Sequence, residues 1–326
     1  MTLEKRRIGT TDIEVTSLGF GGAPIGAANL TIEESSRIVQ RAYDGGVRYF
    51  DTAPLYGEGR SERRMGAGLA QLPRDEIILS TKVGRLLVPA TDSGESTFGE
   101  FEIDYDYSYD AARRSLEASF ERLGLDRVDI LLCHDIDVWT HGDAQPGIFD
   151  TAVNGILPAL NDLREQGVVR AIGLGVNEAE VCSQIMDRFD VDCFLLAGRF
   201  TLLEQAPLDT LLPKCLDQNV SIIIGGPYNS GLLARAERDQ ATYDYKPVDD
   251  ERWARAQAIR EVCDAHQVDI RAAALQYPLR HGAVASVIPG SANMQELESN
   301  LALIDMSLPD TLWTDLEDAG LAKSLA

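Results

Sequence analysis

The segment Val128-Asp129-Ile130-Leu131-Leu132-Cys133-His134 is the clearest example of a short apolar run that recurs along the chain and decides its fold. Its apolar residues follow one another without the polar alternation of a strand that has one face in water. Runs of this kind are typical of parallel strands that are covered on both faces. Amphipathic stretches lie on either side of it, near residues 110–123 and 151–166. The local pattern therefore predicts a buried strand between two helices.

The same alternation of strand-like and helix-like segments fills most of the chain. We expect strands at residues 15–22, 48–53, 77–83, 128–134, 169–176, 193–198, 221–226 and 284–289. We expect helices near 32–45, 61–71, 110–123, 151–166, 179–188, 207–218, 251–281 and 294–303. Thr31 followed by Glu34 has the capping-box spacing that starts a helix.

Eight strand–helix units in about 300 residues favour an α/β fold of the (β/α)8 TIM barrel type over an open sheet. Two further segments lie outside this count. Residues 5–8 and 13–16, joined at Gly9-Thr10, predict a β-hairpin before the barrel, and residues 312–321 predict an extra C-terminal helix. Because no low-complexity linker or break in composition divides the chain, we expect a single domain over residues 1–326.

A doubly wound nucleotide-binding sheet is the competing architecture. It would place Gly-x-Gly-x-x-Gly between its first strand and its first helix. The segment Gly19-Phe20-Gly21-Gly22-Ala23-Pro24 has proline at the sixth position. In the segment that begins Gly173-Leu174-Gly175, Glu178 stands where the third glycine would be needed. The barrel is therefore the better interpretation.

Charge and cysteine content limit the class of protein. A net charge of -22 disfavours binding to nucleic acid or to an anionic membrane surface. No apolar run reaches the roughly 18 residues of a membrane-spanning helix, and the N-terminus lacks the apolar core of a signal peptide. Five cysteines without a Cys-x-x-Cys motif indicate reduced thiols in a cytoplasmic protein, and four histidines without an HExxH pair indicate no metal site. We expect a monomer or small homo-oligomer whose partner is a small molecule.

Polar side chains follow the expected strands at the end where barrels of this type have their active sites. The second strand leads into Asp51 and Tyr56, the third ends at Lys82, and the fourth ends at His134. Neighbouring parallel strands lie about 4.8 Å apart, so three consecutive strand ends lie within about 10 Å of one another. We expect the four side chains to meet in one pocket, with Asp51 as the partner of a part-buried Lys82.

Three of the four have a ready structural explanation when each is taken alone, and Lys82 fits one least well, because a buried lysine needs a partner. Asp51 before Thr52 is a common turn or cap arrangement, Tyr56 suits packing on the barrel rim, and His134 suits a structural hydrogen bond. Together they form a proton-transfer device. A neighbouring cation favours the phenolate of a tyrosine and lowers its pKa, the aspartate holds the lysine, and the histidine orients the reacting oxygen. Such a site suits carbonyl–alcohol interconversion by hydride transfer with a nicotinamide.

The second strand lies in a segment that closely resembles the first signature of the aldo-keto reductases, Gly46-Val47-Arg48-Tyr49-Phe50-Asp51-Thr52-Ala53-Pro54-Leu55-Tyr56-Gly57. Lys82 and His134 complete that family's Asp-Tyr-Lys-His tetrad, and the match runs from the N-terminal hairpin to the last helix. The resemblance implies a (β/α)8 barrel that binds NAD(P)H without a Rossmann motif. Five segments of this chain resemble the family's sugar-oxidising branch: 21–24, 61–64, 82–85, 134–135 and 228–233. That branch includes L-fucose and D-threo-aldose 1-dehydrogenases and the related pyridoxal 4-dehydrogenases.

The resemblance also implies a cofactor site. Asn177 matches the residue that holds the nicotinamide carboxamide, whereas Val176 and Ala197 stand in place of the usual serine and glutamine. Gly225 replaces an aromatic residue that often stacks on the nicotinamide, so backbone groups are expected to substitute. The loop at 227–232 matches the segment that covers the pyrophosphate. The other residues expected at the cofactor are Pro227, Asn229, Gly231, Leu232, Gly290, Ser291, Glu296 and Asn300.

The segment 288–300 bears on the choice between NAD and NADP. Members that use NADP have a basic residue where this chain has Gly290, and an arginine where it has Glu296. A carboxylate about 4 Å from a 2'-phosphate costs on the order of 4 kcal/mol at an effective dielectric near 20. The same carboxylate can accept hydrogen bonds from the ribose hydroxyls of NAD. We expect NAD to be preferred over NADP; the alternative is that Glu296 is a solvated residue of the first helical turn.

Substrate contacts are expected from the loops after the third and fourth strands. The segment 85–109 is long for a barrel connection, and such loops are usually functional lids. Aromatic and acidic residues gather in these loops, among them Tyr105, Tyr107, Tyr109, Asp135, Asp137, Trp139 and His141. They suit a polyhydroxylated ring and, almost as well, a pyridine ring, although solvation of the surface also explains most of the acids. The residues expected to contact the substrate are Tyr56, His134, Trp139 and Arg85.

The leading interpretation is NAD-linked oxidation of the anomeric hydroxyl of an aldopyranose, of the L-fucose or D-threo-aldose type, to its lactone. Tyr56 would act as the general base, so the rate of oxidation should rise toward alkaline pH. A pyridoxal 4-dehydrogenase is the alternative enzyme, because pyridoxal also forms a cyclic hemiacetal. A barrel that senses NAD(P) as a binding subunit without turnover is the non-enzymatic alternative. The sequence leaves the sugar and its stereochemistry open.

Overall fold

The computed structural model describes residues 2–90 and 101–325. The strands in this part of the chain are β1 (Lys5–Arg7), β2 (Glu14–Thr16), β3 (Phe20–Gly21), β4 (Tyr49–Asp51), β5 (Ile78–Val83), β6 (Arg85–Pro89), β7 (Phe101–Tyr105), β8 (Ile130–His134), β9 (Ala171–Val176), β10 (Cys193–Ala197), β11 (Ser221–Gly225), β12 (Thr242–Tyr243), β13 (Lys246–Pro247) and β14 (Val284–Ile288). The α-helices are α1 (Ile32–Asp44), α2 (Arg60–Leu69), α3 (Tyr109–Leu123), α4 (Val138–His141), α5 (Gln145–Asn154), α6 (Ile156–Glu165), α7 (Ala179–Met186), α8 (Leu211–Gln218), α9 (Asp250–Ala265), α10 (Ile270–Gln276), α11 (Met294–Ile304) and α12 (Asp310–Asp318).

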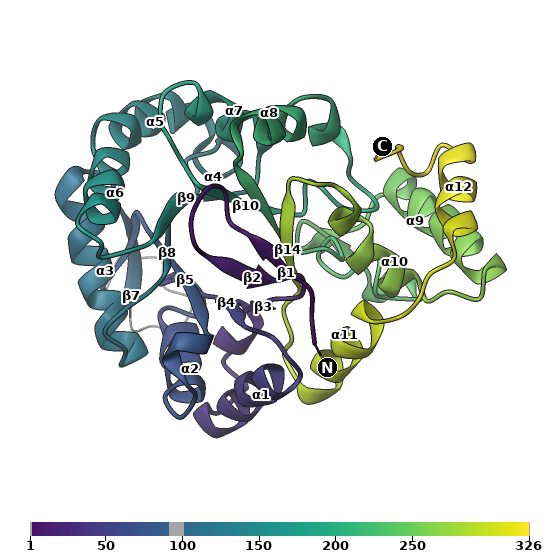
Figure 1. The fold of residues 1–326 in the computed structure, drawn as a ribbon, viewed down its shortest axis with the longest axis horizontal. Coiled ribbons are helices and arrows are strands. Elements are labelled where there is room, and N and C mark those ends of the chain that lie inside the picture. The colour runs from purple at the N-terminus through teal and green to yellow at the C-terminus, as the bar shows by residue number, and fades with distance from the viewer. Residues whose placement is uncertain (1, 91–100, 326) are drawn as a thin grey trace.

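Eight parallel strands of the described chain form one sheet, in the order β14-β11-β10-β9-β8-β5-β4-β3. Parallel bridges from Leu18 to Val287 and from Gly21 to Gly290 join its two edge strands, so the sheet closes on itself. The helices form a ring around it (Figure 1). The predicted (β/α)8 barrel is therefore confirmed, and each of its strands falls within an expected segment.

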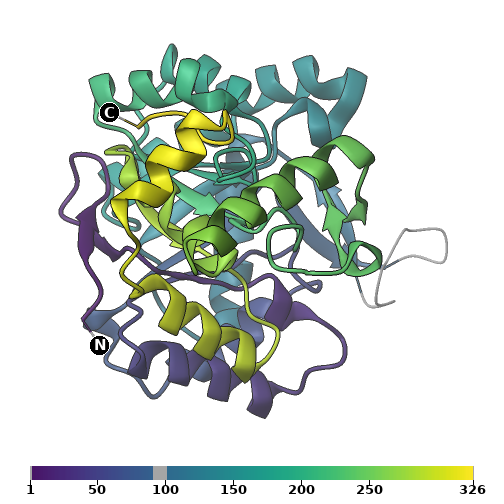
Figure 2. The same cartoon turned by 90° about the vertical axis from the view of Figure 1, so that its right-hand side faces the viewer.

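The N-terminal hairpin of β1 and β2 closes one end of the barrel, which is the near end in Figure 1 and the left side in Figure 2. Ile8, Ile13 and Val15 are fully buried there and belong to the same apolar cluster as Tyr49 and Ile78 inside the barrel. Burying one large apolar side chain contributes about 1.5–3 kcal/mol. Because the hairpin closes this end, an active site is expected at the opposite end of the barrel, where the carboxyl ends of the strands lie.

The helical ring follows the expected segments, with two interruptions. The segment predicted at 151–166 is divided into α5 and α6 at Gly155, whose backbone is not helical. The segment predicted at 251–281 is divided into α9 and α10, because Gln267 between them takes a left-handed conformation with φ 56°. The predicted capping box of Thr31 and Glu34 starts α1, and the predicted C-terminal helix is α12.

Two antiparallel hairpins near the site end of the barrel were not expected from the sequence. β6 pairs with β7 inside the segment predicted as a lid loop, and β12 pairs with β13 after β11. Both pairs consist largely of partly exposed residues, so no continuous apolar run marks them in the sequence. Residues 91–100 of the predicted lid lie outside the described residues.

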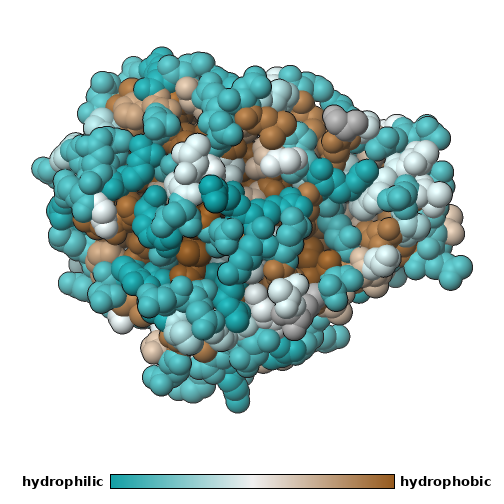
Figure 3. All heavy atoms as spheres, viewed as in Figure 1, coloured by the Kyte–Doolittle hydropathy of each residue, from teal (hydrophilic) through white to brown (hydrophobic). Residues whose placement is uncertain are grey.

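The surface agrees with the composition. Hydrophilic residues predominate on the face that carries the N-terminal hairpin, with hydrophobic residues visible between them (Figure 3). Within residues 2–90 and 101–325, none of the helices combines the length and apolar character needed to cross a membrane.

Candidate active site

The register of the barrel places the predicted residues on one diagonal row. Asp51 lies beside Ser80 of β5, and Lys82 follows Ser80 by two residues. Lys82 lies beside Leu132 of β8, and His134 follows Leu132 by two residues. Because side chains alternate along a strand with a period of two, each step stays on the same face of the sheet. The tilt of barrel strands thus brings these three side chains together.

The row continues onto the next strand. His134 lies beside Gly175 of β9, and Asn177 follows Gly175 by two residues. Gly175 also makes room for the lysine, since a Cβ at this position would lie 3.0 Å from Cε of Lys82. The predicted carboxamide-binding residue is therefore the next member of the row that holds Asp51, Lys82 and His134.

Asp51 and Lys82 form a buried ion pair at the floor of the site. Nζ of Lys82 lies 2.7 and 2.9 Å from the two carboxylate oxygens and donates a further bond of 2.9 Å to the carbonyl oxygen of Thr52. The Ser80 hydroxyl donates to Asp51 at 2.7 Å. Burial lowers the pKa of Lys82, but Asp51 and, to a smaller extent, Tyr56 together more than offset this, so the pKa lies above its ordinary value. The ammonium therefore stays charged at neutral pH.

Tyr56 lies in the turn between β4 and α2, directly over this pair. Nζ of Lys82 is 4.6 Å from the centroid of the Tyr56 ring, and the ring of His134 meets it edge-on with 6.1 Å between centroids. Burial raises the pKa of Tyr56 to about 12, and the Lys82 ammonium offsets only part of this increase. The expected net lowering of this pKa is therefore wrong for the protein alone, because burial outweighs the cation. At neutral pH the side chain is a neutral phenol.

His134 is a neutral imidazole. Burial, followed by the charges of Arg85 and Lys82, holds its pKa well below the ordinary value. Its Nε2 lies 3.3 Å from Oδ2 of Asp135. Its buried Nδ1 has no hydrogen-bond partner in the described part of the chain. The ring can therefore donate one hydrogen bond to a reacting oxygen without carrying a charge.

Asp135 has a more central position in the site than the sequence predicted. It was expected only as one of several acidic acceptors, but it is buried and forms an ion pair of 2.7 Å with Arg85. It also accepts a hydrogen bond of 2.9 Å from Nδ2 of Asn177. Its backbone is left-handed, with φ 44°. Its position directly after the strand-end His134 was the available signal, because both the histidine and the asparagine lie within its reach.

The aromatic residues of the predicted lid take different positions. Tyr105 lies at the mouth of the site, with its ring 5.1 Å from that of His141 and 5.3 Å from the guanidinium of Arg85. Tyr107 is buried, and its hydroxyl donates toward the carbonyl oxygens of His134 and Asp135. Tyr105 is thus in a position to meet a substrate, whereas Tyr107 supports the backbone beneath the site.

Trp139 lies on the rim, where 48% of its surface is exposed. The guanidinium of Arg199 lies 5.4 Å from its ring and the ammonium of Lys246 lies 5.9 Å from it. Arg199 is in turn held by both carboxylate oxygens of Asp244, at 3.0 and 3.1 Å, in the turn between β12 and β13. An unexpected hairpin therefore reaches the predicted substrate-binding tryptophan.

A pocket of about 320 Å³ lies at the ends of β11 and β14 and contains many of the predicted cofactor residues. Its lining includes Pro227, Gly231, Gly290, Glu296 and Asn300, which the sequence predicted, together with Tyr228 of the predicted pyrophosphate loop. It also includes Pro24, Arg235, Tyr245, Arg271 and Ser299, which were not assigned to the cofactor. Pro24, Tyr245 and Arg271 come from other elements than the predicted cofactor residues, so no local sequence pattern marks them.

Five predicted cofactor residues lie outside this lining, and one of them is Asn177, which lies in the row with His134. Leu232 is fully buried in the apolar core, and the Asn229 side chain bonds Thr201 and the carbonyl oxygen of Gly198. Gly225 lies within β11, and Ser291 is buried beneath Asn300, which donates to it at 3.2 Å. Their expected contacts with a cofactor stay predictions.

The pocket has the chemistry that a dinucleotide requires. Two arginines and the N-terminal end of α11 offer positive charge for phosphates. Glycines at 226, 231 and 290 leave parts of its wall without side chains. The pocket also approaches the tyrosine: Pro24 lines it, and a Cβ on the neighbouring Gly26 would lie only 2.9 Å from the carbonyl oxygen of Tyr56. The residues present therefore fit a nicotinamide dinucleotide.

Glu296 and Arg271 lie in this pocket with opposite charges. Glu296 accepts a hydrogen bond of 2.8 Å from the backbone of Ala292, so it also helps to start α11. Arg271 is engaged by both carboxylate oxygens of Asp269 and donates to Ser299 at 3.2 Å. The arginine is thus already partly neutralised by an aspartate, whereas the glutamate keeps a carboxylate at the pocket wall.

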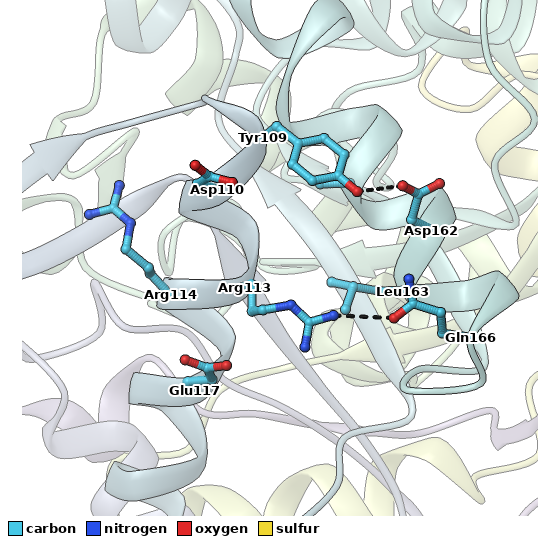
Figure 4. A pocket seen from close by; sticks show the side chains of 9 residues that line it. Tyr109, Asp110, Arg113, Arg114, Glu117, Asp162, Leu163 and Gln166 are labelled. Carbon is cyan, nitrogen blue, oxygen red and sulfur yellow. Dashed lines mark hydrogen bonds between the residues drawn. The ribbon is translucent and has the colours of Figure 1, made fainter.

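Another pocket, of about 330 Å³, lies between α3 and α6 on the outside of the barrel (Figure 4). Polar groups in its lining bond to one another: Tyr109 donates to Asp162, and Arg113 donates to Gln166 at 3.2 Å. Tyr109, expected as part of the substrate lid, therefore faces away from the site. Among residues 2–90 and 101–325, no group of three or more potential metal ligands occurs.

Comparison with known proteins gives matches over nearly the whole chain. A model of the aldo/keto reductase family matches residues 17–320. The chain is 37% identical over 335 residues to a pyridoxal 4-dehydrogenase from Microbacterium luteolum, with 98% of each protein covered. It is also 37% identical over 321 residues to a D-threo-aldose 1-dehydrogenase from a Pseudomonas species, with 95% of each covered.

The fold has similar solved structures. The holo form of an aldo-keto reductase from Bacillus halodurans superposes with a TM-score of 0.79 at 24% identity. The match covers 98% of this chain and 97% of that one. This likeness bears on the architecture alone.

Proposed function

The chain belongs to the aldo/keto reductase family and is an oxidoreductase that acts on CH–OH groups, and from these premises we propose that it oxidises a cyclic hemiacetal to a lactone with NAD. The observation that carries this proposal is the placement of Tyr56 over the buried Asp51–Lys82 pair and beside the neutral His134. The preferred substrate is an aldopyranose of the L-fucose or D-threo-aldose type, which reacts at its anomeric hydroxyl. The similarity to a D-threo-aldose 1-dehydrogenase supports this choice.

The side chains divide the chemistry between them. His134 donates a hydrogen bond to the reacting oxygen and orients it over Tyr56. The deprotonated Tyr56 takes the hydroxyl proton, and Lys82 stabilises the phenolate while Asp51 keeps the ammonium in place. When bound beside the substrate, a nicotinamide would supply the acceptor for the hydride of the same carbon, so that the C–H and O–H bonds break and the carbonyl of the lactone forms.

Pyridoxal is the second candidate substrate. Its hemiacetal presents the same hydroxyl and hydrogen on one carbon, so the four side chains do not distinguish it from a sugar. Trp139 and Tyr105 at the rim offer aromatic faces that suit a pyridine ring. The equal similarity to a pyridoxal 4-dehydrogenase supports this candidate.

A panel of aldopyranoses and pyridoxal, assayed with NAD by the absorbance of the reduced nicotinamide, tests the proposal. We expect turnover with at least one cyclic hemiacetal, and no turnover with an acyclic alcohol of similar size. Binding of NAD without turnover of any member of the panel would instead support the non-enzymatic sensor.

Glu296 is expected to favour NAD over NADP. A carboxylate near a 2'-phosphate is repelled by it, and a difference of about 1.4 kcal/mol corresponds to about a tenfold change. We expect kcat/KM with NAD to exceed that with NADP by at least about tenfold, and Glu296→Gln to narrow the ratio. The ratio of kcat/KM with NAD to that with NADP is measured from initial rates with both dinucleotides at a fixed substrate concentration.

Glu298→Gln is the matched control for this prediction. Glu298 lies on the same helix but pairs with Arg41, at 2.6 and 2.9 Å, outside the pocket. Its removal should leave the NAD-to-NADP ratio unchanged. Equal efficiency with the two dinucleotides in the wild-type protein would refute the assignment of Glu296.

A further inference from the structure

Asp135 joins the two halves of the candidate site through a single carboxylate. Its Oδ2 lies 2.7 Å from Arg85 and 3.3 Å from Nε2 of His134. Its Oδ1 accepts a hydrogen bond of 2.9 Å from Nδ2 of Asn177. The proposed proton-handling side, at the histidine, and the proposed cofactor side, at the asparagine, thus meet at one residue.

The carboxylate selects one form of the histidine. A neutral imidazole carries its proton on either nitrogen, and the hydrogen-bonding surroundings decide which. Burial raises the pKa of Asp135 to about 7, and the Arg85 guanidinium opposes this rise. In its ionised form Asp135 favours the imidazole with the proton on Nε2, the nitrogen that lies 3.3 Å from its Oδ2. The buried Nδ1 has no partner in the described residues that would favour the other form. The proton is therefore held on the nitrogen nearest the carboxylate.

The same argument orients the asparagine. Because a carboxylate accepts and does not donate, Asn177 must present its NH2 group to Asp135. Its amide oxygen is then turned away from the carboxylate and is available as an acceptor. This chain has Val176 and Ala197 where the family usually has a serine and a glutamine that bind the carboxamide. Binding of the carboxamide therefore depends more strongly on the orientation of Asn177.

We propose that Asp135 is a positioning residue that sets the donor of His134 and the acceptor of Asn177 at the same time. The N–H on Nε2 of His134 is then shared between Asp135 and the reacting oxygen when a substrate is bound, and the asparagine oxygen is free to accept from the NH2 group of the nicotinamide carboxamide. This inference rests on the proposed function, since that function assigns the two side chains to substrate and cofactor.

The surroundings hold Asp135 in place although its backbone is left-handed. Its amide donates to the carbonyl oxygen of Gly175 at 2.9 Å, and its own carbonyl oxygen lies 2.7 Å from the Tyr107 hydroxyl and 2.8 Å from Nε2 of His141. Asparagine and glycine tolerate this conformation better than other residues. Asp135→Asn and Asp135→Gly therefore remove the charge or the side chain without adding backbone strain.

The first test reads the tautomer directly. The chain has only four histidines, so 15N-histidine labelling with a His134→Gln variant for assignment isolates the signal of His134. We expect a protonated Nε2 and an unprotonated Nδ1 in the wild-type protein, and a shift toward the other form in Asp135→Gly. Asp137→Asn is the control, because the hydrogen bonds of Asp137 go to the backbone amides of Thr140 and Asn177 and not to the imidazole of His134. It should leave the His134 signal unchanged.

The second test is the dissociation constant of NAD, measured by calorimetry. We expect Asp135→Gly to weaken NAD binding by about tenfold, which corresponds to the loss of one oriented hydrogen bond. Asp135→Asn should weaken NAD binding less, because the amide oxygen of asparagine can still accept the hydrogen bond from Asn177. An unchanged His134 signal in Asp135→Gly would overturn the inference, and so would an unchanged dissociation constant. Neither readout needs turnover. If the protein oxidised no cyclic hemiacetal, the proposed function would be refuted. The His134 signal and the dissociation constant of NAD would still test the role of Asp135, because neither depends on turnover.

Discussion

Replacing Tyr56 with phenylalanine is expected to lower kcat for oxidation by about 10²- to 10⁴-fold, which is the usual contribution of a general acid or base. The substitution removes the hydroxyl of Tyr56 and keeps its ring, which lies beside the ammonium of Lys82 and the ring of His134. Binding of NAD should change little, because Tyr56 is absent from the lining of the predicted cofactor pocket. Steady-state turnover and calorimetric NAD binding measure the two effects separately.

Tyr109→Phe is the matched control, since Tyr109 faces the groove between α3 and α6 and its hydroxyl bonds Asp162 (Figure 4). It should retain wild-type turnover. If Tyr56→Phe kept more than about a tenth of wild-type kcat, Tyr56 would not be the group that moves the proton.

Replacing Lys82 with methionine is expected to cost both stability and activity. It leaves the Asp51 carboxylate buried without its partner, and breaking a buried ion pair in this way typically costs about 3–5 kcal/mol. It also removes the charge that lowers the pKa of Tyr56, so the phenolate becomes harder to form. We expect a lower denaturant midpoint and a fall of at least about tenfold in the rate of oxidation at a given pH.

The double variant Asp51→Asn/Lys82→Met separates the two effects. It removes both charges, so it should recover much of the lost stability while its turnover stays low. A double variant as unstable as Lys82→Met would show that the cost comes from lost packing. Wild-type turnover in either variant would show that the ammonium does not assist Tyr56.

The barrel itself could be predicted because its interior strands have no solvent-facing side. Runs such as those in β8 and β11 lack polar alternation, and that absence is visible in the sequence. Asp51, Lys82 and His134 could be placed together because the ends of neighbouring parallel strands are always close. The hairpins β6–β7 and β12–β13 escaped prediction, because their short, partly exposed strands leave no comparable pattern.

Parts of the site depend on packing that sequence reasoning does not reach. The net rise in the pKa of Tyr56 follows from burial, which a list of neighbouring charges does not include. Arg271 enters the cofactor pocket because α10 packs beside α11, a contact between two helices that the local sequence around Glu296 does not show. Asp135 was visible as a residue, but its contacts with Arg85 and Asn177 follow only from the register of β8 against its neighbours.

The central claim is that Tyr56 exchanges the proton of the reacting hydroxyl, and its pH dependence tests this most directly. A phenol with a pKa of about 12 is protonated at neutral pH. The phenolate fraction needed for oxidation therefore rises about tenfold per pH unit below that value, whereas the phenol needed for reduction stays available. Single-turnover formation of reduced nicotinamide, with substrate deuterated at the reacting carbon to identify the hydride step, gives the rate. We predict that oxidation accelerates from about pH 7 to 10 while reduction stays nearly constant. A hydride step whose oxidation rate does not change over this range would contradict the account.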